Sequence, residues 1–180
     1  GSGRLSKLLL PTMLLIVGVG LFWLAQKFPL ISDSIGYVYA AERVVEGEGL
    51  SYEDGYNESA GPYFSLYAFQ IQRDDGGRMY LGFPPGLPIL LAAAIGLLGN
   101  ELAVRFLIPL LALLGVYMTA LLGDLIGERR WIGLTAVVFL VATPVFWEFG
   151  TAVWSEIPSM TLVTAGFYFF IRCGNEASSV

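Results

Sequence analysis

Long uncharged stretches, separated by short charged ones, dominate the chain. Four of them can cross roughly 30 Å of hydrocarbon as helices, at about 1.5 Å per residue. The first follows Arg4 and Lys7 and has no small-residue cleavage site after its apolar core, so we interpret it as a retained span rather than a signal peptide. We therefore predict transmembrane helices over residues of about 8–28, 104–124, 131–149 and 156–172.

A fifth apolar stretch, Leu87–Leu98, is too short for an ordinary span and follows Pro84-Pro85. If it crossed the membrane, the basic residues Arg129-Arg130 and Arg172 would lie outside, against the positive-inside rule. We therefore predict an interfacial helix over 86–98. This choice puts both termini in the cytoplasm and makes the chain an integral protein of the cell (plasma) membrane.

Residues 30–102 then form one large outer loop. Ser32, Asp33 or Ser34 can start a short surface helix, and Gly47 or Gly49 can end it. Aromatic and β-favouring residues over 63–72 and 78–83 flank Asp74-Asp75-Gly76-Gly77, a pattern that predicts a β-hairpin. The predicted fold class is an all-α polytopic membrane protein. It is a single membrane module over 1–180, with four transmembrane helices and an outer loop holding juxtamembrane helices and a small β-hairpin.

Composition supports an apolar solvent and narrows the chemistry. The chain of 180 residues is 56% hydrophobic and 14% charged, with no histidine and one cysteine, Cys173. The mean hydropathy is +0.68. These counts exclude histidine-based nucleophile pairs, an HExxH zinc helix and an internal disulfide framework. The net charge of −5 argues against a nucleic-acid partner. Residues 31–83 hold nine acidic and three basic side chains, so the outer loop carries the excess of acid.

Asp33 is the main candidate for chemistry, because it lies where the first predicted span meets the outer loop. It can act as a helix N-cap or as a general base whose proton affinity rises with partial desolvation. Tyr37, one turn later, can position a substrate or serve as an interfacial aromatic anchor.

Glu156 begins the fourth predicted span on the same outer face. It can favour the helix N-terminus electrostatically or act as a second carboxylate that binds substrate or a divalent cation. Arg105 can meet a lipid phosphate or extend toward the interface as a long side chain. Pro84-Pro85-Gly86 stiffens the entry to the short helix and exposes backbone amides.

The ordered set of these segments resembles the glycosyltransferase C superfamily. More narrowly, it is similar to bacterial and archaeal relatives of the protein O-mannosyltransferases and aminoarabinose transferases, a family 39-like group. The segments lie in the expected order over nearly the whole chain: Asp33-Ser-Ile-Gly-Tyr37 with Ala40-Ala41, then Asp75 to Pro88 with its Pro-Pro pair, then Asn100 to Phe106, and finally Ser155-Glu156-Ile157-Pro158.

The resemblance implies inverting transfer of a sugar from a polyprenyl-phosphate donor to an acceptor hydroxyl or amine at the outer membrane face. Asp33 would be the catalytic base and Glu156 a second catalytic carboxylate. Tyr37, Arg105, Pro85 and Gly86 would bind substrate. Membrane lipid and the lipid-linked sugar are the expected partners, and a divalent cation (Mg²⁺ or Mn²⁺) on Asp33 and Glu156 is the one cofactor considered.

The chain departs from these relatives in two ways. Ser34 stands where many of them carry a second acid, and they have seven or more spans. We therefore interpret the chain as an amino-terminal portion of such an enzyme and expect no transfer from these 180 residues alone. The alternative function is a non-enzymatic membrane subunit or scaffold that binds a partner through the outer loop.

Overall fold

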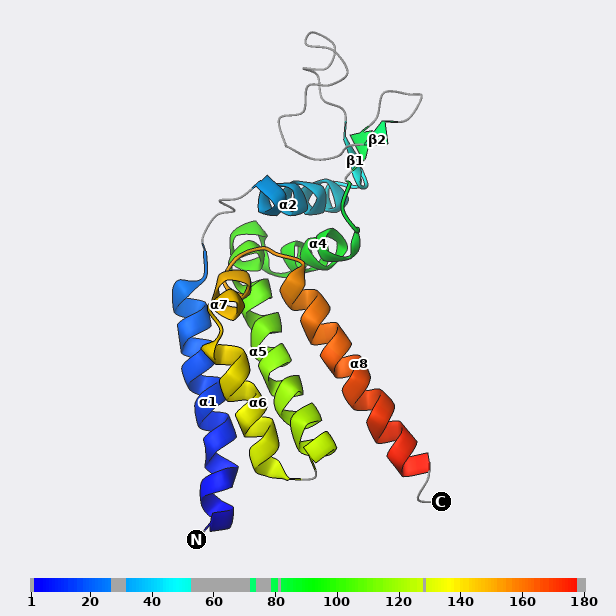
Figure 1. The fold of residues 1–180 in the computed structure, drawn as a ribbon. Helices are drawn as coiled ribbons and strands as arrows, with labels where there is room; N and C mark the ends of the chain where they lie inside the picture. Colours follow the sequence, from blue (N-terminus) through cyan, green and yellow to red (C-terminus); the bar gives the residue numbers. More distant parts are fainter. Residues whose placement is uncertain are drawn as a thin grey trace. The chain divides into compact units, whose positions relative to one another are not determined.

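Seven helices and three very short strands make up the described part of the protein. The structure is a computed structural model, and it describes residues 2–26, 32–52, 72–73, 79–80, 82–127 and 129–177. The elements in chain order are α1 (Ser2–Leu24), α2 (Ser32–Val45), β1 (Ser51–Tyr52), β2 (Gln72–Arg73), β3 (Met79–Tyr80), α4 (Gly86–Leu98), α5 (Asn100–Gly127), α6 (Arg130–Ala142), α7 (Pro144–Gly150) and α8 (Glu156–Ala177) (Figure 1).

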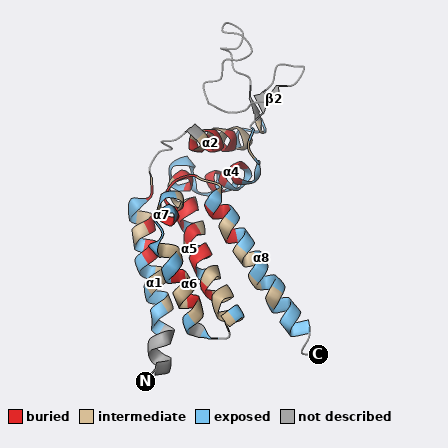
Figure 2. Ribbon diagram, in the orientation of Figure 1, coloured by how far each residue is buried: buried red, intermediate tan, exposed pale blue. Residues whose placement is uncertain are grey.

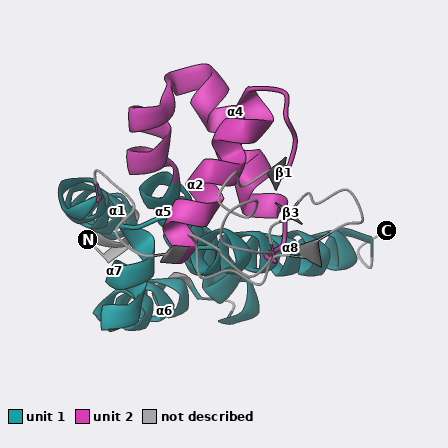
Figure 3. Ribbon diagram, turned by 90° about the horizontal axis from the view of Figure 1, so that it is seen from above, with its two compact units in different colours: residues 1–25, 108–180 teal, residues 26–107 magenta. Residues whose placement is uncertain are grey.

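The chain divides into two compact units, drawn in different colours in Figure 3. Unit 1 comprises residues 1–25 and 108–180, and unit 2 comprises residues 26–107. Helix α5 contributes its first turns to unit 2 and the rest of its length to unit 1.

In unit 2, α2 packs on α4 through small and apolar residues. Gly99 is the one residue between α4 and α5. Its φ of 82° is positive, a backbone conformation that glycine adopts readily and other residues rarely do. Asn100 Nδ2 donates a hydrogen bond to Glu42 Oε1, which ties the start of α5 to α2. The buried side chains on α2 and α4 include Tyr37, Val38, Ala40, Ala41, Leu87, Leu91, Ala92 and Ile95.

In unit 1, α1, α6 and α8 run lengthwise beside α5, and α7 follows α6 at the end of the unit away from the N-terminus (Figure 1). Close helix contact depends on glycine: a Cβ added to Gly123 would lie 2.7 Å from the Cα of Gly133, so α5 and α6 touch backbone to backbone there. A hydrogen bond from the Gly133 N–H to Asp124 Oδ1 (2.9 Å) closes this seam. It satisfies one of the amides that the first turn of α6 leaves without an intrahelical partner.

Helices α6 and α7 form a bent pair, with an angle of 76° between them. The bend falls at Thr143-Pro144, where proline lacks the N–H that would continue the helix. The indole Nε1 of Trp147 donates to the Val141 carbonyl (2.8 Å), and Thr143 Oγ1 donates to the Leu140 carbonyl (2.6 Å). These side chains satisfy two carbonyls at the break.

The predicted fold of four spans with a β-hairpin is wrong. Among the described residues, α5 is the one helix that is long and apolar enough to cross a membrane, and the bent pair α6–α7 adds a second if it counts as one span. The described apolar stretch of α1, Leu8–Leu24, is shorter than a span, and α8 does not pass the same test of length and hydropathy. The single long span predicted over 131–149 is broken at Pro144.

The strands also differ from the prediction. They form a three-stranded antiparallel sheet of order β1-β3-β2, in which Tyr80 pairs with both Ser51 and Gln72. The added strand β1 lies beside β3, so this is not the isolated hairpin that the glycine turn predicted. The predicted turn itself and residues 63–71 lie outside the described residues.

Candidate functional site

Helix α2 holds two of the predicted site residues in unit 2. It begins at Ser32, so Asp33 lies within the first turn rather than before it, where its charge favours the positive end of the helix dipole. The Asp33 side chain is half-buried. Tyr37, one turn later, is only 4% exposed, and Ser34 between them is 1% exposed. Ser34 and Tyr37 are therefore buried, while the nearby Asp33 carboxylate is partly exposed to solvent.

A ring contact connects α2 to the segment that leads into α4. The rings of Tyr37 and Phe83 lie 5.4 Å apart at 47°. Phe83 directly precedes Pro84-Pro85, and α4 begins at Gly86. A Cβ added to Gly86 would meet no atom within 4 Å, so the start of α4 is open to an incoming group. The contact of Tyr37 with Phe83 therefore connects α2 to the segment before α4, in which Pro85 and Gly86 are exposed.

Arg105 lies in the first turns of α5, also in unit 2, and is half-buried. Its guanidinium carbon lies 4.9 Å from the centroid of the Phe106 ring. Its Nε is buried and has no hydrogen-bond partner in the described structure. A buried guanidinium N–H left without an acceptor is costly, and an anionic group brought to it would remove that cost.

Glu156 belongs to unit 1 and not to the unit that holds Asp33. It is the first residue of α8 and is exposed. The Ser155 carbonyl before it accepts hydrogen bonds from the Ser159 amide (3.1 Å) and hydroxyl (2.7 Å). The predicted meeting of Asp33 and Glu156 stays a prediction, as does a cation held by them. Within the described ranges, no group of three or more acidic or cysteine side chains lies together as a metal site would require.

Sequence reasoning did not single out three features of these units. Phe83 is the partner of Tyr37, and its place directly before two prolines was the available signal. Asn100 bonds Glu42 across 58 positions of sequence, which no local pattern reveals. Trp154 stacks edge-on against Phe149 (5.3 Å, 78°), and its buried Nε1 has no hydrogen-bond partner in the part of the chain that the structure describes.

Comparison with protein-family models, with curated proteins and with solved structures finds no match to this chain.

Proposed function

We propose that this chain provides the carboxylate base and part of the donor site for glycosyl transfer from a polyprenyl-phosphate sugar at a membrane surface. The observation that carries the proposal is the grouping within unit 2. Half-buried Asp33, buried Tyr37, the open start of α4 at Gly86 and the unpartnered Nε of Arg105 all belong to this compact unit.

Each residue has a definite part in this reaction. Asp33 takes the proton from the acceptor hydroxyl or amine as the acceptor atom bonds to the anomeric carbon from the face opposite the leaving group. The bond between that carbon and the phosphate oxygen breaks, and the lipid phosphate leaves with the electron pair, so the sugar is inverted. Arg105 and the backbone amides at Gly86 stabilise the negative charge of that phosphate, and Tyr37 positions α2 against the Pro84-Pro85 segment.

The surface of unit 1 supports a membrane location. Large apolar side chains are exposed on each of the long helices α1, α5, α6 and α8 of the unit. Figure 2 colours all exposed residues pale blue, and these are most extensive on α8. Soluble monomers rarely expose apolar patches of this extent. The exposed large apolar side chains of unit 1 include Leu15, Ile16, Val19, Trp23, Leu110, Leu114, Phe139, Leu162, Phe167 and Phe170.

The charges of unit 1 support an orientation. Figure 1 places the start of α1, the α5–α6 connection and the end of α8 at one end of the unit. The basic positions Arg4, Lys7, Arg129, Arg130 and Arg172 all belong to these segments. The opposite end carries Glu148 and Glu156 and, among described residues, no basic one. By the positive-inside rule we propose that the basic end of unit 1 faces the cytoplasm and that the membrane is the plasma membrane.

The test is sugar transfer in native membranes of the cell that makes this protein, supplied with labelled polyprenyl-phosphate hexoses and pentoses. Asp33→Asn should lower the transfer rate at least about 100-fold, since a positioned base contributes roughly that much. The matched control is Glu46→Gln, which removes an exposed carboxylate directly after α2 and should leave the rate unchanged. Transfer that survives in Asp33→Asn contradicts the proposal, as does the absence of transfer, with every donor, in native membranes that hold the unsubstituted protein.

A further inference from the structure

Most of α8 is accessible in the described structure. Its buried residues, Ile157, Pro158 and Thr161, all lie in its first two turns. No residue of α8 beyond Thr161 is buried in the described structure, although the helix continues to Ala177. The two faces of this part of α8 differ in polarity, which indicates what contacts each of them.

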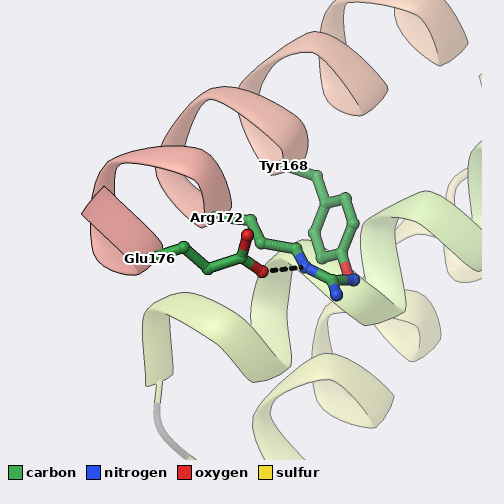
Figure 4. A network of polar contacts seen from close by, with 3 residues as sticks. All are labelled: Tyr168, Arg172 and Glu176. Atoms are coloured by element: carbon green, nitrogen blue, oxygen red, sulfur yellow. Dashed lines mark hydrogen bonds and ion pairs between the residues drawn. The ribbon is translucent and has the colours of Figure 1, made fainter. Parts of the chain in front are cut away.

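One face of α8 is polar and is turned toward α5. Thr161 is 2% exposed and donates a hydrogen bond from Oγ1 to the Leu111 carbonyl of α5 (2.9 Å). Thr164, Tyr168 and Arg172 follow at spacings of three and four residues, so they continue the same face. Arg172 donates from Nη1 to the Tyr168 hydroxyl (3.0 Å) and from Nε to Glu176 Oε1 (3.1 Å). Figure 4 shows this network on the α5 side of α8.

The opposite face is apolar and bulky. Phe170 is 79% exposed, and its neighbours on this face also project outward. An open hollow of about 390 Å³ is lined by Val163, Gly166, Phe167 and Phe170. A second hollow of about 720 Å³ lies beside it along the helix and shares Phe170 in its lining. The apolar face of α8 is therefore an uneven surface of exposed phenylalanine rings with open hollows between them.

We propose that lipid acyl chains cover this face of α8, with Arg172 at the level of the phosphate headgroups. The inference rests on the membrane location proposed above and adds which side of α8 the lipid contacts. The contrast with α5 and α6 favours lipid over a further helix. Their seam brings two glycines into backbone contact, as protein seams in membranes do, whereas α8 presents phenylalanine rings.

The charges at the end of α8 agree with this occupant. Arg172 is exposed and uses two of its five N–H groups on Tyr168 and Glu176, which leaves the others for phosphate oxygens. The connection between α5 and α6, which includes the exposed Arg129, lies at the same end of unit 1 as the end of α8 (Figure 1). Two exposed guanidinium groups at one end of an apolar surface complement the negative headgroups of phospholipids.

The test uses nitroxide labels on single cysteines in a Cys173→Ser background, with the protein in nanodiscs of phosphatidylcholine and phosphatidylglycerol. Labels at Phe167→Cys and Phe170→Cys should collide with oxygen several-fold more often than a label at Thr164→Cys, and should be shielded from a water-soluble nickel chelate. Because Phe167 and Phe170 are exposed, both variants should keep the circular dichroism of the parent.

A further label at Leu114→Cys, on the exposed side of α5, separates the two proposals. If Leu114→Cys is oxygen-accessible but the α8 labels are reached by the nickel chelate, or show spin–spin broadening from a second copy, the inference about α8 is wrong and the membrane location stands. If Leu114→Cys is also reached by the nickel chelate, the membrane location itself is wrong, and the inference about α8 fails with it.

Discussion

The contact between α5 and α6 gives the sharpest prediction about the fold, and Gly133→Ala is the change that tests it. A methyl group at Gly133 would overlap the Ala120 carbonyl oxygen and the Asp124 carboxylate. The carbonyl oxygen belongs to the backbone of α5 and cannot rotate away, so the two helices must separate. The hydrogen bond from the Gly133 N–H to Asp124 (2.9 Å) would lengthen at the same time.

The cost of Gly133→Ala follows from these two effects. Overpacking in a close-packed interior costs about 1–3 kcal/mol. A hydrogen bond to a charged acceptor contributes about 1.5–3 kcal/mol, part of which is lost as the helices move apart. We expect a loss of about 3 kcal/mol, which lowers the Tm of a chain of this size by about 10 °C.

The assay is thermal unfolding in detergent followed by circular dichroism, with Gly166→Ala as the matched control. Gly166 lies inside α8, and a Cβ there would meet no atom within 4 Å. Because alanine is the better helix former by about 1 kcal/mol, Gly166→Ala should melt at or slightly above the parent Tm. A Gly133→Ala protein that melts with the parent would refute the close α5–α6 contact.

Two further predictions concern the bend and the orientation of unit 1. Trp147→Phe removes the donor to the Val141 carbonyl and should cost about 1–3 kcal/mol of unfolding free energy in the same melting assay. The control is Trp23→Phe, at a side chain that is 84% exposed, and it should change the Tm little. Equal shifts in Tm would contradict the role of the Trp147 indole at the bend. Cys173 is exposed near the end of α8, at the end of unit 1 that is proposed to face the cytoplasm. A membrane-impermeant maleimide should therefore label Cys173 only after the cells are permeabilised, whereas Glu148→Cys in a Cys173→Ser background should be labelled in intact cells. The reverse pattern would contradict the proposed orientation.

The positions of the long helices could be predicted from sequence because the uncharged stretches begin and end at charged residues or glycines. The number of spans could not, and Pro144 shows why. Pro11 and Pro109 lie inside α1 and α5 without a break, so a proline in an apolar stretch does not by itself predict one. At Pro144 the chain bends by 76°, and Trp147 and Thr143 supply hydrogen bonds to the freed carbonyls. That local pairing depends on three-dimensional geometry.

Helix α8 was misjudged for a different reason. The stretch before Arg172 is uncharged, which predicted a span, but Thr161, Thr164 and Tyr168 lie on one face with Arg172, and these polar residues lower the mean hydropathy of the helix. For the candidate site, the resemblance implied one set of residues that included Glu156 as well as Asp33, Tyr37, Pro85 and Gly86; the last four belong to unit 2, whereas Glu156 belongs to unit 1. Burial of Ser34 and the contact of Tyr37 with Phe83 depend on how α2 packs, which the spacing of residues along the chain does not specify.

The central claim is that Asp33 acts as a base beside a bound lipid-linked sugar. It is tested most directly by measuring donor binding and sugar transfer on the same membranes. A polyprenyl-phosphate sugar with a photoreactive group should label the unsubstituted protein and Asp33→Asn equally, while only the former transfers sugar. Arg105→Gln should reduce the labelling itself, since it removes the guanidinium proposed to meet the phosphate. If Asp33→Asn transfers sugar at the parent rate, or loses labelling and transfer together, Asp33 is not the base.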